Sequence, residues 1–131
     1  MTDALHAAGL WAGLLILLMV VLSTMVVSRR RRRLVSFGDG GHDDLAAASR
    51  AFGNASEYAP VGIAALILLA LLGAPEIAVH AIGATLFVGR VVHALGLLFQ
   101  RGPSLGRVLG MVLTYLALIV SAGGLIVLAF L

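Results

Sequence analysis

The sequence of 131 residues contains no cysteine and no lysine, and only 11% of its residues are charged. The absence of cysteine excludes disulfide bonds and thiolate metal sites. With 61% hydrophobic residues, the chain is too apolar for a soluble domain of this length, so its composition is typical of a membrane protein. The length leaves room for one compact bundle, and we expect a single membrane domain over residues 1–131.

Because lysine is absent, the formal charge of +3 comes entirely from arginine. Five of the nine basic residues form one run, residues 29–33, directly after an apolar segment. Such a run is typical of a membrane-orientation signal rather than a nucleic-acid surface, so no nucleic-acid partner is expected. Arg50, Arg101 and Arg107 fall on the same side of the membrane as this run. The positive-inside rule therefore predicts that both termini lie outside the cytoplasm.

Hydrophobic runs and turn signals predict four membrane-spanning helices. The apolar segment at about 7–27 is long enough to cross a hydrocarbon core of ~30 Å at ~1.5 Å per residue. The basic run follows this segment instead of preceding it, which argues against a signal peptide. Glycine- and proline-containing breaks separate the later helices, whose own glycines would allow close packing. We predict an all-α, up-down-up-down bundle with helices at about 5–28, 43–73, 76–99 and 105–131.

Polar residues gather where the second predicted helix enters the membrane, in the stretch SRAFGNASEYAP. At about 100° per residue, four of them fall within one stripe: Arg50, Asn54, Glu57 and Tyr58. In the third predicted helix, Arg90 and His93 share a face, and Arg90 lies roughly two turns below the end of its span. A lone arginine at that depth is costly, so we expect Arg90 to face the bundle interior and to pair with Glu57.

Two interpretations of these residues remain open. A buried Arg90–Glu57 pair could fix the register of two helices and bind nothing. The region nevertheless holds more cations than anions, because Arg50 and Arg107 join Arg90, and such an excess around a cavity favours an anionic ligand. No metal is expected, since the histidine and aspartates at 42–44 are better explained as a solvated helix start.

Three motifs resemble the MAPEG superfamily (membrane-associated proteins in eicosanoid and glutathione metabolism), especially its bacterial inner-membrane branch. They are SRAFGNASEYAP, FVGRVVHALGL at 87–97 and GRVLGM at 106–111, and the resemblance covers essentially the whole chain. It implies a homotrimer of four-helix subunits in the inner membrane, with both termini periplasmic. A glutathione site would lie between neighbouring subunits on the cytosolic side. The implied function is a glutathione transferase or glutathione-dependent peroxidase, with glutathione as co-substrate and a hydrophobic electrophile as second substrate.

The resemblance also assigns roles to individual residues. Glutathione binding falls to Arg30, Arg50, Asn54, Glu57, Tyr58, Arg90 and His93. Arg107 is the implied catalytic residue, because an arginine near the start of the fourth helix stabilises the glutathione thiolate in the family. Leu97 and Met111 stand where some mammalian relatives have tyrosines that contact glutathione, and Tyr115 substitutes only partly. Eicosanoid synthesis is not expected in a protein that resembles the bacterial branch.

Two other classes of function stay open. A small multidrug-type transporter would also have four helices and an intramembrane glutamate, and Glu57 should then stand unopposed so that protons and cationic drugs compete for it. The nearby arginines speak against this alternative. The other alternative is a non-catalytic membrane scaffold of the same fold. Glutathione binding would separate these classes.

Overall fold

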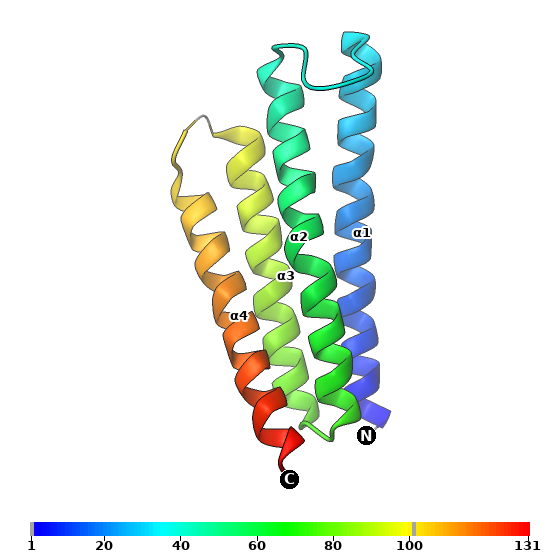
Figure 1. Cartoon of the computed structure of the whole chain (residues 1–131), viewed down its shortest axis with the longest axis vertical. Coiled ribbons are helices and arrows are strands. Elements are labelled where there is room, and N and C mark those ends of the chain that lie inside the picture. Colours follow the sequence, from blue (N-terminus) through cyan, green and yellow to red (C-terminus); the bar gives the residue numbers. More distant parts are fainter. Residues whose placement is uncertain (1, 101) are drawn as a thin grey trace.

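The computed structural model of the protein describes residues 2–100 and 102–131, and within them the chain forms four long helices (Figure 1). Helix α1 spans Thr2–Arg33, α2 spans Asp43–Leu71, α3 spans Glu76–Phe99 and α4 spans Leu105–Ala129. Each of the four is long and apolar enough to cross a membrane. The predicted all-α class and the four spanning helices are confirmed, while Arg101 lies outside the described residues.

Helix α1 is longer than predicted. We expected it to end near residue 28, but it continues through the whole arginine run to Arg33. Arginine is a good helix former, and cations are favoured at a helix C-terminus, where the backbone carbonyls carry partial negative charge. The helix ends at Leu34, whose φ of 54° is left-handed. The Val35 N–H group then donates to the Arg30 carbonyl at 3.1 Å and closes the last turn.

Consecutive helices connect at alternate ends of the molecule (Figure 1). The α1–α2 connection lies at the same end as the C-terminal end of α3 and the beginning of α4. The α2–α3 turn lies at the other end, together with both chain termini. The polar start of α2 and the first turn of α4 therefore lie at the same end of the bundle, although the whole of α2 and α3 separates them in the sequence.

Helices α2 and α3 form the middle of the bundle. Helix α1 packs on α2 and α3, and α4 packs on the same two helices, but α1 and α4 do not contact each other within the described residues. The α3–α4 seam is close because glycines face each other across it. A Cβ atom on Gly110 would lie 2.5 Å from the His93 backbone nitrogen and 2.7 Å from the Gly89 carbonyl oxygen. Backbone therefore packs directly on backbone in this seam.

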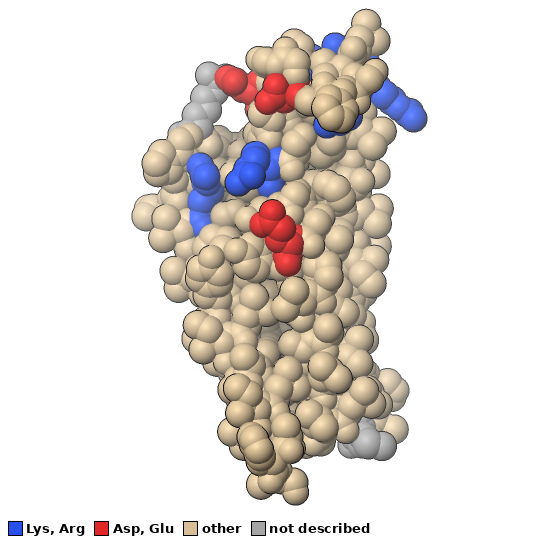
Figure 2. Space-filling model, viewed as in Figure 1, with Lys and Arg blue, Asp and Glu red and all other residues tan. Residues whose placement is uncertain are grey.

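Charged side chains on the face shown in Figure 2 gather toward the end with the α1–α2 connection, and the lower part of this face carries none. Large apolar side chains are exposed on all four helices, among them Leu17, Leu68, Ile77 and Ile119. Such an extensive apolar surface suits lipid rather than water. The polar residues of the sequence motifs are therefore confined to one half of the bundle.

Candidate functional site

Arg90 of α3 is fully buried and lies at the centre of a hydrogen-bond network that joins α2, α3 and α4. Its Nε donates to Thr114 Oγ1 at 2.8 Å, and its Nη1 donates to Asn54 Oδ1. Nη2 donates to the Gly110 carbonyl at 3.4 Å and to the Met111 sulfur at 3.2 Å. All of these partners are neutral. Hydrogen bonds, rather than an ion pair, thus hold the guanidinium inside the bundle.

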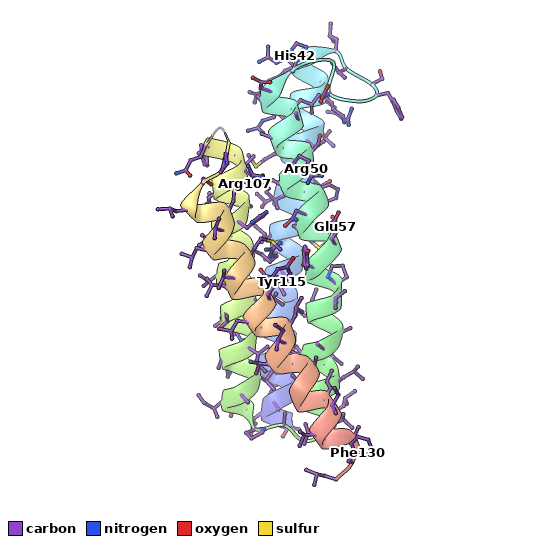
Figure 3. All side chains as sticks on the ribbon, turned by 60° about the vertical axis from the view of Figure 1, so that its left-hand side comes forward. His42, Arg50, Glu57, Arg107, Tyr115 and Phe130 are labelled. Carbon is purple, nitrogen blue, oxygen red and sulfur yellow. The ribbon has the colours of Figure 1, made fainter. Side chains whose placement is uncertain are left out.

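Tyr58 covers the same guanidinium from α2. The Arg90 Cζ atom lies 5.0 Å from the centroid of the Tyr58 ring, within the range of a cation–π interaction. The Tyr58 hydroxyl is 3.4 Å from the Tyr115 hydroxyl, and the two rings pack edge to face. Because Tyr115 is exposed on α4, it extends the network from the buried arginine to the surface of the bundle (Figure 3).

The predicted ion pair between Arg90 and Glu57 is wrong. Glu57 is exposed, and within the part of the chain that the structure describes no ion pair includes it. Figure 3 shows Glu57 on the side of α2 that faces away from α4. Asn54 and Tyr58 are four residues apart and share the face toward Arg90, whereas Glu57 lies about 100° around the helix from Tyr58. The predicted polar stripe therefore exists. Asn54 and Tyr58 on one side of it contact Arg90, whereas Glu57 on the other side does not.

Arg50 and Arg107 line an open groove of about 530 Å³ at the loop end of the bundle. The groove lies between the beginnings of α2 and α4 and the end of α3, and Figure 3 shows Arg50 and Arg107 on α2 and α4 at this end. Arg107 Nη1 donates to the Gly102 carbonyl at 2.8 Å. The Arg107 backbone N–H group donates to Ser104 Oγ at 3.3 Å, which caps the start of α4. Arg107, the predicted catalytic residue, thus lies in the first turn of α4, where Ser104 caps the helix, and lines the groove.

His93 connects the buried network to this groove. It lies one helical turn after Arg90 in α3 and is buried. Its Nδ1 is 2.9 Å from the backbone oxygen of Arg107. The contact joins α3 to the first turn of α4, so His93 positions the segment that carries Arg107.

Apart from Glu57 and Arg30, the predicted site residues fall into two connected groups, the buried network around Arg90 and the groove with Arg50 and Arg107. Residues 8–127 match the sequence pattern of the MAPEG family. The chain belongs to the MAPEG family.

This MAPEG protein is similar to two bacterial relatives. Both are called inner membrane protein YecN, one from Escherichia coli strain K12 and one from Escherichia coli O6:H1, and each is 40% identical over 62 residues. The match covers 47% of this chain and 47% of each relative, so it spans about half the length of either protein. With its four apolar helices, the MAPEG chain is an integral, multi-pass membrane protein.

Arg30 lies apart from the other predicted site residues of this MAPEG chain. Its Nη1 donates to the Gly38 carbonyl at 2.8 Å, within the connection that follows α1. Arg107 lies in the first turn of α4, and α1 and α4 do not contact each other within the described residues. Arg30 and Arg107 therefore lie on helices that do not pack on each other.

The contribution of α4 to the Arg90 network was not predicted from the sequence. Thr114 is completely buried and donates its hydroxyl to the Gly110 carbonyl at 2.8 Å while accepting from Arg90. One signal was available, because Thr114 lies four residues after Gly110 and one turn before the buried Ala117. A lone polar residue on the glycine-bearing face of an apolar helix indicates an interhelical contact.

Proposed function

We propose that this protein binds glutathione and acts as a glutathione transferase or glutathione-dependent peroxidase on hydrophobic electrophiles in the bacterial inner membrane. One observation carries the proposal. The groove is lined by Arg50 and Arg107 together with Asp43 and Asp44, and Asp44 pairs with Arg33 of α1 instead of with either groove arginine. Two guanidinium groups at one groove can bind an anionic ligand. Family membership makes glutathione the leading choice.

The chemistry of glutathione suits this arrangement. The tripeptide carries two carboxylates, an ammonium group and a thiol, and arginine binds carboxylates with two parallel hydrogen bonds. Arg50 and Arg107 of the groove can supply these donors. The exposed carboxylate of Glu57 lies outside the groove, seven residues or about 10 Å from Arg50 along α2, so it can accept the ammonium of a tripeptide that extends from the groove along α2. No ion pair among residues 2–100 and 102–131 includes Glu57, so its carboxylate is available to the ammonium.

Arg107 is the proposed catalytic residue. A guanidinium beside the sulfur lowers the pKa of a thiol from about 8.5, so that more of it is thiolate at neutral pH. The thiolate can attack an electrophilic carbon, forming a C–S bond as the leaving group departs with the electron pair. With a hydroperoxide it attacks oxygen, giving an alcohol and a sulfenic acid. A second glutathione then yields the disulfide and water.

The assembly and topology that we propose complete the site. The four helices cross the membrane alternately, and three subunits form a homotrimer in which Arg30 of one subunit approaches the groove of its neighbour. Arg30 uses one guanidinium nitrogen on the Gly38 carbonyl of its own chain, which leaves its other N–H groups for a ligand at the neighbouring groove. Cross-linking in native membranes should therefore produce species up to three subunits and none larger. A dominant dimer would contradict the trimer and favour the transporter alternative.

The proposed orientation places both termini in the periplasm. The basic side chains of α1, Arg50 and Arg107 lie in the half of the bundle with the α1–α2 connection, which the positive-inside rule assigns to the cytoplasm. A reporter active only in the periplasm should give a signal when fused after Leu131. The same reporter inserted near Gly40 should remain silent. The reverse pattern would place the groove away from cytosolic glutathione.

Glu57→Gln tests the proposed ligand contact. We expect glutathione binding to weaken roughly tenfold or more, because a charge-assisted contact contributes on the order of 1.5–3 kcal/mol. Glu57 is exposed and does not hold Arg90, so the subunits should remain folded and assembled. Isothermal titration in detergent measures the affinity, and the oligomer is checked on the same sample.

Glu76→Gln is the matched control, since it removes the same charge from an exposed residue at the other end of the bundle. Glu76 contacts only His80, at 3.5 Å, among the ion pairs of the described residues. Its affinity for glutathione should equal that of the parent. If Glu57→Gln also binds like the parent, Glu57 is not a glutathione ligand.

One structural feature meets a condition of the transporter alternative, since Glu57 has no ion pair within the described residues. Membership of the MAPEG family favours glutathione instead. The parent protein should be titrated separately with glutathione and with a lipophilic quaternary cation. The transporter alternative would be supported if the cation gave binding heat that is lost at low pH while glutathione gave none. Binding of neither compound would favour the non-catalytic scaffold.

A further inference from the structure

The five arginines at the end of α1 divide into two groups by their contacts. Arg29 Nη1 donates to the Asp44 carbonyl at 2.8 Å, Arg30 bonds the Gly38 carbonyl, and Arg33 pairs with the Asp44 carboxylate at 3.4 Å. These three hold the α1–α2 connection and the start of α2 against α1.

The side chains of the other two, Arg31 and Arg32, make no hydrogen bond or ion pair within residues 2–100 and 102–131. Both charges are therefore available to an external anion.

Arg31 and Arg32 line an open depression of about 440 Å³ on the outer face of α1, together with Thr24, Val27 and Ser28. The Thr24 hydroxyl is bonded to a backbone carbonyl of its own helix. The Ser28 hydroxyl forms no hydrogen bond within the described residues, so it can donate to a ligand. This open surface of α1 thus presents two guanidinium groups and one hydroxyl without a hydrogen bond in the described residues.

An apolar stripe leads along α1 to this depression. Leu17 and Val20 are 61% and 53% exposed, and Val27, seven residues or two turns after Val20, continues the stripe to Arg31 on the same face. On the other side of the arginines, Leu34 is 91% exposed. When α1 crosses the membrane, its terminal arginines lie at the level of the phospholipid headgroups and the stripe lies beside the acyl chains.

We propose that Arg31, Arg32 and Ser28 bind the phosphate of an anionic phospholipid whose acyl chain lies along Leu17 and Val20. Guanidinium groups bind phosphate oxygens through paired, charge-assisted hydrogen bonds. A zwitterionic lipid carries its own ammonium beside the phosphate and competes less well for two arginines. Free phosphate compounds lack the chain that occupies the apolar stripe. The site depends on membrane insertion and uses neither Arg50 nor Arg107 of the groove.

Native mass spectrometry of the full-length protein in detergent tests the site. The probes are phosphatidylglycerol, phosphatidylethanolamine with the same acyl chains, and glycerol 3-phosphate at equal concentration. We expect retention of phosphatidylglycerol, weaker retention of phosphatidylethanolamine, and none of glycerol 3-phosphate. An arginine near an anionic lipid contributes about fivefold to affinity, so Arg31→Gln/Arg32→Gln should weaken phosphatidylglycerol binding about 25-fold.

Single variants provide the matched comparison. Arg31→Gln should weaken phosphatidylglycerol binding about fivefold. Arg33→Gln removes the same charge from the same helical turn but breaks only an exposed ion pair, so its effect should stay below about twofold. Arg31→Lys/Arg32→Lys keeps both charges and should retain most of the binding. The single variants and the parent's lipid preference still decide the matter if the double glutamine variant does not fold.

Several results would overturn the proposal. Equal losses in Arg31→Gln and Arg33→Gln, or equal retention of the two lipids, would indicate general charge attraction without a site. Retention of glycerol 3-phosphate as strong as that of the lipid would indicate an anion site only. Dissociation of the oligomer in the double variant would assign this surface to a second copy of the chain. Displacement of the lipid by glutathione would assign Arg31 and Arg32 to the glutathione site, whereas failure of glutathione to bind at all leaves this lipid site unaffected.

Discussion

Replacing Gly110 by alanine should destabilise the bundle by about 3 kcal/mol or more and prevent α3 and α4 from packing as they do in the parent protein. The added Cβ would lie 2.5 Å from the His93 backbone nitrogen and 2.7 Å from the Gly89 carbonyl oxygen. Backbone atoms cannot rotate away as a flexible side chain can, so one helix must shift. The shift would also move the Gly110 carbonyl and Thr114 away from Arg90, leaving a buried cation with fewer partners.

Gly123→Ala is the matched control in the same helix, because a Cβ at Gly123 meets nothing within 4 Å. Alanine forms helix better than glycine, by about 0.5–1 kcal/mol, so this variant should be as stable as the parent or slightly more stable. Thermal unfolding followed by circular dichroism in detergent compares the three proteins. Equal stability of the two alanine variants would show that the α3–α4 seam is wider than the structure indicates.

The fold was predictable from the sequence because four apolar runs longer than the membrane is thick leave little choice of architecture. The end of α1 was not predicted, because the arginines were taken as a boundary of the apolar run. They mark where the chain leaves the membrane, but the helix itself continues beyond that point to Arg33. Cations stabilise the last turn of a helix, so the run continues α1 beyond the apolar segment until Leu34 adopts a left-handed conformation.

The interior position of Arg90 was predicted correctly from the cost of a charge in lipid, but its partners were not. The prediction matched charge with charge and therefore chose Glu57. A guanidinium has five N–H donors and needs acceptors, which need not be anionic. Asn54, Thr114 and the Gly110 carbonyl supply them. Which acceptors are near depends on how closely α3 and α4 approach, and sequence spacing within one helix does not contain that information.

The arginine run shows the same limit of sequence patterns. All five residues look equivalent in the sequence, and Arg30 was chosen to represent them. The structure separates them through the path of the α1–α2 connection, which brings the Gly38 and Asp44 carbonyls back to α1. These contacts span eight and fifteen residues. Local periodicity shows which face of a helix a residue occupies. Which arginines find hydrogen-bond acceptors depends instead on the path of the α1–α2 connection.

Arg107→Ala should lower kcat for glutathione conjugation by about 10²–10³, with a much smaller change in KM for glutathione. A residue that stabilises the thiolate acts on the reacting atom, so its loss is felt in the transition state more than in binding. Arg107 lies in the groove and bonds the Gly102 carbonyl through one guanidinium nitrogen, which leaves other N–H donors for the sulfur. Steady-state kinetics with an activated aryl chloride measures both parameters.

The pH dependence of the same variant separates thiolate stabilisation from binding. The role proposed for Arg107 is to favour the charged thiolate, which would lower the pKa of bound glutathione below its ordinary value of about 8.5. Removing Arg107 should return the pKa toward that value, and the rising limb of the rate profile should move to higher pH. Arg107→Lys keeps the positive charge and should show a smaller shift.

Arg50→Ala, in the same groove, should instead raise KM with little change in the pH profile, as expected for a residue that only binds the tripeptide. If Arg107→Ala behaves like Arg50→Ala, both arginines bind glutathione and the thiolate is stabilised by another group.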